Sequence, residues 1–225
     1  MTPDRQSRVE AALGESIAKS RSVGGGCIAD SRRLTTRSGE SYFLKQARSG
    51  QNPDMLRAEA NGLRELRKAR AVRVPEVLAA ESDFLLLEFI AEGRARSGSY
   101  AELGRGFAQL HRFRGKAFGF HADNFLGTSI QSNRTSGNAA TSWSAFYAEH
   151  RLGFQLRLAE RNGSATPELR RGLERLLDKL SDLLSETEEP PTLLHGDLWS
   201  GNHLIDTQGR GWLIDPAVSY GHREA

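Results

Sequence analysis

The 225-residue sequence contains little of what marks secreted, membrane or nucleic-acid-binding proteins. Its single cysteine excludes a disulfide framework within the chain. No apolar run is long enough to cross a bilayer, and the polar first residues are unlike a signal peptide. The net charge is only +3, and the arginines are interleaved with glutamates rather than gathered in a basic stripe. We therefore expect a cytoplasmic protein with no membrane and no nucleic-acid partner.

The strongest pattern is the run from His195 to Asn202, which reads H-G-D-L-W-S-G-N and is followed by a second acidic motif ending at Asp215. Protein kinases carry a catalytic loop H-R-D-x-x-x-x-N and, further along, a metal-binding aspartate. Four residues separate Asp197 from Asn202, as in that loop. Two polar turns with solvated carboxylates are the alternative, but they do not explain the full set. The spacing predicts a phosphotransferase that uses ATP and Mg²⁺, with Asp197 as general base and with Asn202 and Asp215 as metal ligands.

The N-terminal half contains the other parts of a kinase nucleotide site in the expected order. Gly24, Gly25 and Gly26 form a cluster whose backbone N–H groups can approach phosphate oxygens closely. Lys45 ends an alternating, β-prone segment, where a kinase has the lysine that holds the α- and β-phosphates. Alone, a triple glycine is more often a flexible loop and a strand-end lysine is usually solvated. It is the order of the motifs that supports the nucleotide site.

A helix is predicted to follow Lys45, because apolar residues recur at helical spacing from residue 55 onward and Asp54 can cap the start. Glu59 lies near the beginning of this helix and is the expected ion-pair partner of Lys45. Glu65 is the alternative, but it comes two turns later and among basic residues. We therefore favour Glu59.

Two strands are expected next, over residues 74–78 and 84–90. The second strand would lead into the hinge, where the backbone groups of Glu88, Phe89 and Ile90 meet the adenine. A plain core strand is the competing interpretation, and both can hold together.

These elements predict an α+β fold of two lobes, with a small β-rich first lobe that contains one long helix and a larger, mainly helical second lobe. Residues 1–92 would bind the nucleotide, and residues 93–225 would carry the catalytic loop and the acceptor site. Residues 1 to about 20 are expected to be a polar, partly helical lead-in. Further helices are predicted over about 99–113, 142–161 and 167–185. The Ser-, Asn-, Gly- and Thr-rich segment 124–141 is expected to be a long exposed loop.

The chain resembles the fructosamine kinase (ketosamine-3-kinase) family, a relative of the aminoglycoside and choline kinases. Two features single out this family: the Leu198-Trp199-Ser200-Gly201 filling of the catalytic loop, and Asp215-Pro216-Ala217 in place of D-F-G. Further matches extend the resemblance from residue 24 to residue 222; they are Gly25-Gly26-Cys27-Ile28, Phe118-Gly119-Phe120-His121, Asn124, Gly127, the segment 143–152 and Tyr220-Gly221-His222.

The resemblance implies a kinase-like fold and ATP- and Mg²⁺-dependent phosphorylation of the sugar 3-hydroxyl of ketosamines, the fructosamine or ribulosamine adducts of lysine and protein amines. The unstable product releases the amine, which amounts to deglycation. In the family an acidic residue and further helices follow the position of Ala225, so this sequence looks truncated, with part of the acceptor site missing. A kinase for another small polar acceptor, aminoglycoside- or choline-like, and a non-catalytic nucleotide-binding fragment are the alternatives.

Several side chains are weaker candidates for contact with the sugar. Trp199 is expected either to form an apolar wall of the sugar pocket or to be a core aromatic that fixes the loop. His121, His222 and Glu224 can hydrogen-bond sugar hydroxyls, but a structural or exposed role is the more common one. His195 is expected to organise the loop backbone without taking part in the chemistry.

Cys27 lies in the glycine loop, where a positive local field favours the thiolate. Its oxidation or an interchain disulfide would block ATP binding, whereas an inert small residue is the plainer interpretation. A monomer and a homodimer, the latter redox-linked through Cys27, both remain open.

Overall fold

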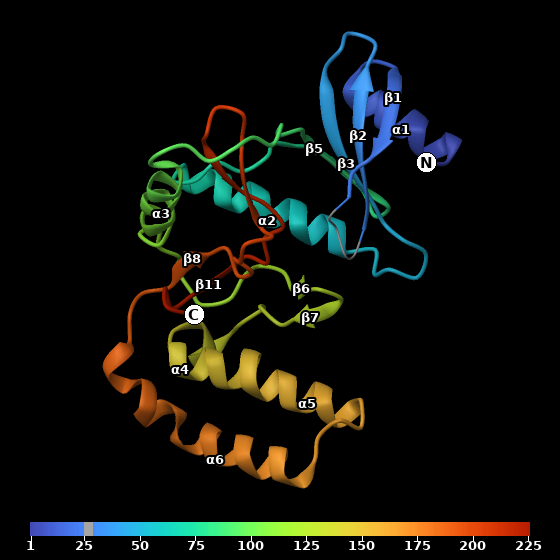
Figure 1. Cartoon of the computed structure of the whole chain (residues 1–225). Helices are drawn as coiled ribbons and strands as arrows, with labels where there is room; N and C mark the ends of the chain where they lie inside the picture. Colours follow the sequence, from blue (N-terminus) through green and yellow to red (C-terminus); the bar gives the residue numbers. More distant parts are fainter. Residues whose placement is uncertain (25–28) are drawn as a thin grey trace.

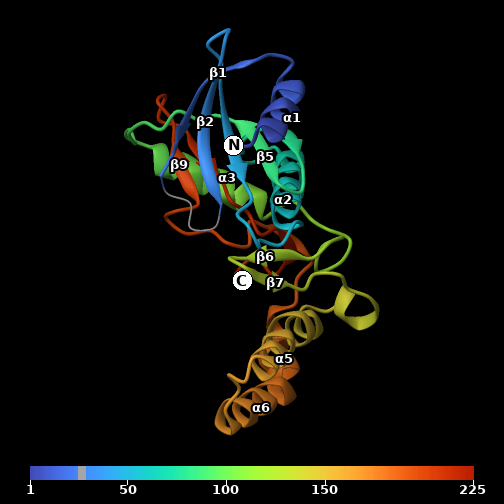
Figure 2. The ribbon, with the colours of Figure 1, turned by 90° about the vertical axis from the view of Figure 1, so that its right-hand side faces the viewer.

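The computed structural model describes residues 1–24 and 29–225 and confirms the predicted α+β, two-lobed kinase-like fold. A twisted antiparallel sheet with two helices forms one end of the molecule, and α5 and α6 lie side by side at the other end (Figures 1 and 2). Between these two ends lie a small hairpin and the four short strands that flank the predicted catalytic residues. The boundary near residue 92 stays a prediction.

The sheet has five strands in the order β1-β2-β3-β5-β4. Their bounds are Ile17–Ser22 for β1, Asp30–Thr36 for β2, Ser41–Gln46 for β3, Val77–Ala80 for β4 and Phe84–Glu88 for β5. The helix α1 (Pro3–Leu13) begins at a Thr2 cap and buries Val9 against apolar side chains of β2, β3 and β5. The strand predicted over 74–78 is β4, which begins three residues later, at Val77. The strand predicted over 84–90 is β5, which ends at Glu88.

The helix α2 (Met55–Ala69) forms the core between the sheet and the rest of the chain. Leu56, Ala60, Leu63 and Leu66 are buried on one side of it, as their helical spacing predicts. They belong to the same apolar cluster as side chains of β5, of β8 and of β10. Asp54 stands at the N-cap position, as predicted, but its carboxylate makes no capping hydrogen bond among the described residues.

The second part of the chain contains the predicted helices with shorter bounds. The helix α3 (Ser99–Leu110) ends three residues earlier than expected. The segment expected as one helix over 142–161 is α4 (Trp143–Phe146), a π-helical turn (Tyr147–Gly153) and α5 (Phe154–Arg161). The long helix α6 (Pro167–Leu184) begins with a Thr166 cap and a proline in its first turn. Short 3₁₀ turns cover Gly137–Ala140 and Ser185–Thr187.

The segment 124–141 is not the exposed loop that its composition predicts. It forms a hairpin of β6 (Asn124–Leu126) and β7 (Ser129–Gln131), and the side chains of Asn124, Gln131 and Asn133 are buried. The Asn124 amide donates a 2.7 Å hydrogen bond to the carbonyl oxygen of Val218, which is 94 residues away in the sequence. Polar residues here pack against the catalytic strands, and a composition argument misses that tertiary contact.

Four short strands flank the predicted catalytic residues Asp197, Asn202 and Asp215. β8 (Thr192–Leu194) pairs with β11 (Ser219–Gly221), and β9 (His203–Ile205) pairs with β10 (Gly211–Leu213).

Among the residues that the structure describes, no helix is both long and apolar enough to cross a membrane.

The central position of α2 makes its buried leucines the most costly to truncate. We expect Leu63→Ala to lower the free energy of unfolding by about 2–5 kcal/mol, because Leu63 is 1% exposed and its removal leaves a cavity. The matched change Leu183→Ala, at a side chain that is 62% exposed on α6, should cost about 0.5 kcal/mol or less. Urea denaturation of both variants measures the difference, and equal losses would show that α2 is not the core of the molecule.

Candidate active site

The catalytic loop begins at His195, which is hydrogen-bonded to the segment around Asp215. Ala217 N donates to His195 O at 2.9 Å, and the His195 ring donates from Nε2 to Ile214 O at 3.0 Å. The other ring nitrogen accepts from Asp197 N at 3.4 Å. Burial lowers the pKa of His195 to about 4, so the ring is neutral near pH 7 and can donate at one nitrogen while accepting at the other. This geometry agrees with the expected loop-organising role.

Gly196 allows the loop to approach the segment that follows β10. Its φ is +80°, in the left-handed region, and a Cβ built on it would lie 2.0 Å from the carbonyl oxygen of Ala217. No side chain fits in that space unless the backbone moves.

Asn202 holds Asp197 in place. Its Nδ2 donates to the Asp197 backbone oxygen at 2.7 Å and to the Asp197 carboxylate Oδ2 at 3.0 Å. The amide oxygen of Asn202, to which no described residue donates, is left available for another ligand. Burial raises the pKa of Asp197, although Asn202 opposes the shift, and the nearby Asp215 charge adds to it. A carboxylate with a raised pKa is a better proton acceptor.

Lys45 joins three separate elements. From β3 its Nζ lies 2.7 Å from Glu59 Oε1 on α2 and 2.5 Å from Asp215 Oδ1. The Lys45 and Glu59 side chains are 10% and 15% exposed, while Asp215 is 42% exposed. Burial favours the neutral amine, but the two carboxylates outweigh it and raise the pKa of Lys45 above its usual value. Lys45 therefore stays charged at neutral pH.

Glu65, the alternative partner, points elsewhere. It accepts hydrogen bonds from the Tyr220 hydroxyl at 2.9 Å and from Lys68 Nζ at 2.6 Å. The ion-pair partner of Lys45 on α2 is Glu59.

Gly62, which the sequence did not single out, and Asn124, which was named only as a family match, position the Asp215 segment. Gly62 faces Pro216, where a Cβ would lie 3.1 Å from the proline Cγ, so the glycine lets this segment pack against α2. A glycine within a helical pattern was the available signal. Asn124 holds the Val218 carbonyl, and its signal was hidden in a stretch with loop-like composition.

The predicted nucleotide-binding positions are only partly described. Gly24 is exposed just after β1, whereas Gly25, Gly26 and Cys27 lie outside the described residues. Glu88 ends β5, and its backbone N–H donates to Glu76 O at 2.9 Å. This N–H is therefore already used within the chain and is not free for the adenine.

The segment that follows Glu88 offers free backbone groups. Phe89 lies beneath the Arg33 guanidinium, 4.4 Å from it, and Ile90 makes no backbone hydrogen bond within the described part of the chain. Further along, Gly93 N donates to Ile205 O at 2.8 Å, which ties this segment to the β9–β10 hairpin of the catalytic half.

The structure does not bring all the candidate sugar contacts to Asp197. Trp199 is 62% exposed, which rules out the core role and leaves the pocket wall as a prediction. His222 lies against Trp143 and 3.9 Å from Glu189. Glu224 is exposed nearby.

Strand direction explains why His222 and Glu224 are distant from Asp197. β11 runs antiparallel to β8, so its end pairs with Thr192 and the chain leaves on the side away from the catalytic loop. His121 packs on Phe120 and lines a cavity that none of the residues around Asp197 enters.

The close approach at Gly196 generates a prediction with an internal control. We expect Gly196→Ala to lower the unfolding midpoint by several degrees, because the new Cβ meets the Ala217 carbonyl. Gly127→Ala has the same sign of φ (+61°) but no atom within 4 Å of the new Cβ, so it should cost only the backbone strain of about 1 kcal/mol. Thermal unfolding compares the two. Similar midpoints would mean that the contact at Gly196 does not constrain the loop.

Comparison with known proteins agrees with this geometry. The fructosamine kinase family model matches residues 1–225. A chloroplastic protein-ribulosamine 3-kinase of Arabidopsis thaliana is 39% identical over 216 residues, covering 93% of this chain and 64% of the relative. A probable ketoamine kinase of a Synechocystis strain is 37% identical over 213 residues, covering 92% of this chain and 69% of the relative. The chain thus spans about two thirds of the length of these proteins.

A solved structure described as a putative fructosamine-3-kinase from Thermobifida fusca superimposes with a TM-score of 0.85 at 30% identity. The superposition covers 100% of this chain and 76% of that structure. The match includes the sheet, α2 and the catalytic strands, because it extends over the whole chain. The chain belongs to the fructosamine kinase family.

Proposed function

We propose that this chain transfers the γ-phosphoryl group of ATP to the sugar 3-hydroxyl of ketosamines, the adducts of fructose or ribulose type on lysine and other amines. The observation that carries the proposal is the convergence of Asp197, Asn202, Asp215 and Lys45 at one place, from elements far apart in the sequence. The acceptor is inferred from the family, one relative of which is named a protein-ribulosamine 3-kinase. Loss of the phosphorylated sugar would then return the free amine.

The donor set fits a magnesium ion. The amide oxygen of Asn202 and the half-exposed carboxylate of Asp215 are hard oxygen ligands, the type that Mg²⁺ prefers. Lys45 neutralises only one of the charges of Glu59, Asp215 and Asp197, so the cluster keeps negative charge for a cation. Asn202 and Asp215 would hold the ion, which would supply charge stabilisation at the phosphates.

Lys45 is the residue proposed to hold the α- and β-phosphates. Glu59 holds the Lys45 ammonium on the inner side of β3, so this positive charge is oriented before the nucleotide binds. Gly24 and its neighbours would cover the phosphates, and the free backbone groups at Ile90 would meet the adenine.

In the reaction, Asp197 accepts the proton of the attacking 3-hydroxyl. The hydroxyl oxygen forms a bond to the γ-phosphorus while the bond from that phosphorus to the β-phosphate oxygen breaks, and ADP leaves. Asn202 directs the Asp197 carboxylate through its 3.0 Å hydrogen bond. Trp199, which is exposed two residues after Asp197, would form an apolar wall for the sugar.

The proposal is tested by ATP- and Mg²⁺-dependent phosphorylation of a ribulosyl- or fructosyl-lysine derivative. We expect Asp197→Asn to lower kcat by about 10²–10⁴-fold with little change in nucleotide affinity, because only the proton acceptor is lost. Asp178→Asn removes the same charge from the exposed face of α6 and should leave kcat unchanged.

Three outcomes would contradict the proposal. Turnover that survives in Asp197→Asn would remove the assigned base. Nucleotide binding without ketosamine turnover, but with turnover of an aminoglycoside or amino alcohol, would assign another acceptor. Nucleotide binding without any turnover would indicate a non-catalytic fragment.

A further inference from the structure

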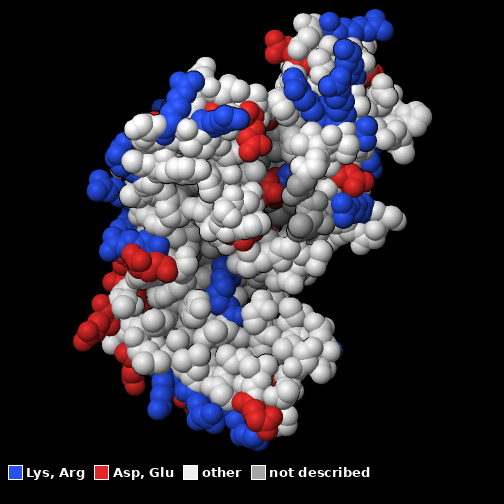
Figure 3. All heavy atoms as spheres, viewed as in Figure 1, with Lys and Arg blue, Asp and Glu red and all other residues white. Residues whose placement is uncertain are grey.

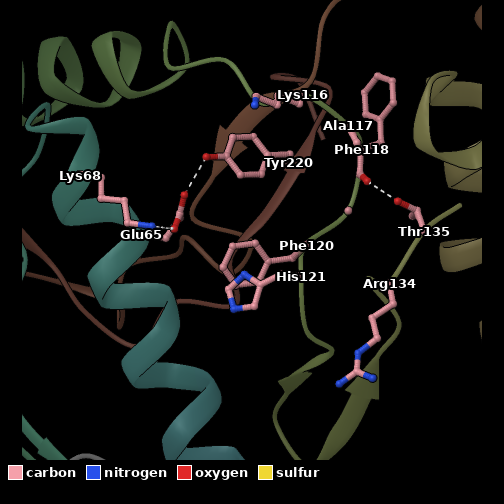
Figure 4. A pocket seen from close by; sticks show the side chains of 11 residues that line it. Glu65, Lys68, Lys116, Ala117, Phe118, Phe120, His121, Arg134, Thr135 and Tyr220 are labelled. Atoms are coloured by element: carbon pink, nitrogen blue, oxygen red, sulfur yellow. Dashed lines mark hydrogen bonds and ion pairs between the residues drawn. The ribbon is translucent and has the colours of Figure 1, made fainter.

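A cavity apart from the candidate active site lies beneath the C-terminal half of α2, on the side of β11. It has a volume of about 590 Å³, within the range of small-molecule sites. It is lined by α2, by the loop 116–121, by residues 134 and 135 and by Tyr220 (Figure 4). None of Lys45, Glu59, Asp197, Asn202 and Asp215 lines it.

The lining of this cavity is cationic. Lys68, Lys116 and Arg134 line it together with a single carboxylate, that of Glu65. Glu65 is already engaged, since it accepts from the Tyr220 hydroxyl and from Lys68. Lys116 and Arg134 make no ion pair or side-chain hydrogen bond within the described residues. Basic side chains lie in the hollow between α2 and α4, as the space-filling view shows (Figure 3). A ligand with about two negative charges would balance this lining.

Rings form the wall between these cations. Tyr220, Phe120 and His121 stand in a row, with Lys116 near one end and Arg134 near the other in the view of Figure 4. The Phe120 and His121 rings are in contact, with centroids 4.1 Å apart. Flat side chains of this kind favour a planar or cyclic partner that can stack on them.

The cavity is separated from the nucleotide site along α2. Glu65 follows Glu59 by six residues, which is about 9 Å of helix. Between them Gly62 packs directly on Pro216 and Val218, so the helix and the Asp215 segment close the space on that side. A ligand in the cavity would therefore not occupy the position of ATP.

We propose that this cavity binds a small phosphate monoester that carries a ring, independently of the nucleotide. The phosphate pairs with Arg134 at one end of the row of rings, the ligand's ring stacks on Phe120, His121 and Tyr220, and Lys116 adds positive charge at the other end. This site is additional to the proposed phosphoryl transfer and does not depend on it.

The test uses phenyl phosphate as the probe and titration calorimetry as the readout, with the protein saturated by a non-hydrolysable ATP analogue and Mg²⁺. We expect one molecule to bind per chain. The double variant Lys116→Ala/Arg134→Ala should weaken binding at least tenfold. Arg175→Ala/Lys179→Ala removes the same charge from exposed positions of α6 and should change the affinity less than twofold. Unfolding midpoints of both double variants confirm that they are folded.

Three results would overturn the proposal: no binding of phenyl phosphate, competition between phenyl phosphate and the ATP analogue, or equal weakening in the two double variants. Competition would place the probe in the nucleotide site. Equal weakening would show that net charge alone attracts it. None of these results bears on whether ketosamines are phosphorylated, which the activity assay measures separately.

Discussion

The buried charge of Lys45 is the constraint on which the rest of the site depends. An ammonium removed from water is costly unless carboxylates surround it, and losing one partner of such a cluster typically costs about 3–5 kcal/mol. Here the partners come from α2 and from the segment after β10, so the requirement holds the sheet, the helix and the catalytic half together. Because Asp215 also keeps an exposed carboxylate oxygen, the same cluster that stabilises the fold leaves a place for a metal ion.

Backbone hydrogen bonds then transmit this arrangement to the catalytic loop. Ile214 donates to Asn202 O at 3.0 Å and accepts from the His195 ring, so the loop that holds Asp197 and the segment that holds Asp215 move as one unit. The neutral state of His195 matters here, because a charged ring would lose its acceptor nitrogen. Electrostatic stabilisation of phosphoryl transfer requires groups that are fixed in advance, and these bonds fix them without using the side chains that would touch the substrates.

The core helix and the main site residues could be predicted from the sequence, because they depend on local patterns. The apolar period of residues 55–69 and the spacing of Asp197, Asn202 and Asp215 are local patterns, and Glu59 follows from its place near the helix start. What could not be predicted depends on contacts between distant segments. Asn124 looked like part of an exposed loop and is instead buried against Val218. The His222 ring can hydrogen-bond sugar hydroxyls, but the direction of β11 carries it away from Asp197. Gly25, Gly26 and Cys27 stay predictions.

If Glu59 orients the Lys45 ammonium for the nucleotide, removing the Glu59 charge must weaken the binding of Mg²⁺-ATP. Glu59→Gln and Glu65→Gln make the same chemical change on the same helix, six residues apart. We expect Glu59→Gln to weaken Mg²⁺-ATP binding at least tenfold, because Lys45 loses a partner at 2.7 Å, whereas Glu65→Gln should change it less than twofold. Equal effects of the two substitutions, or a larger effect at Glu65, would contradict this role of Glu59.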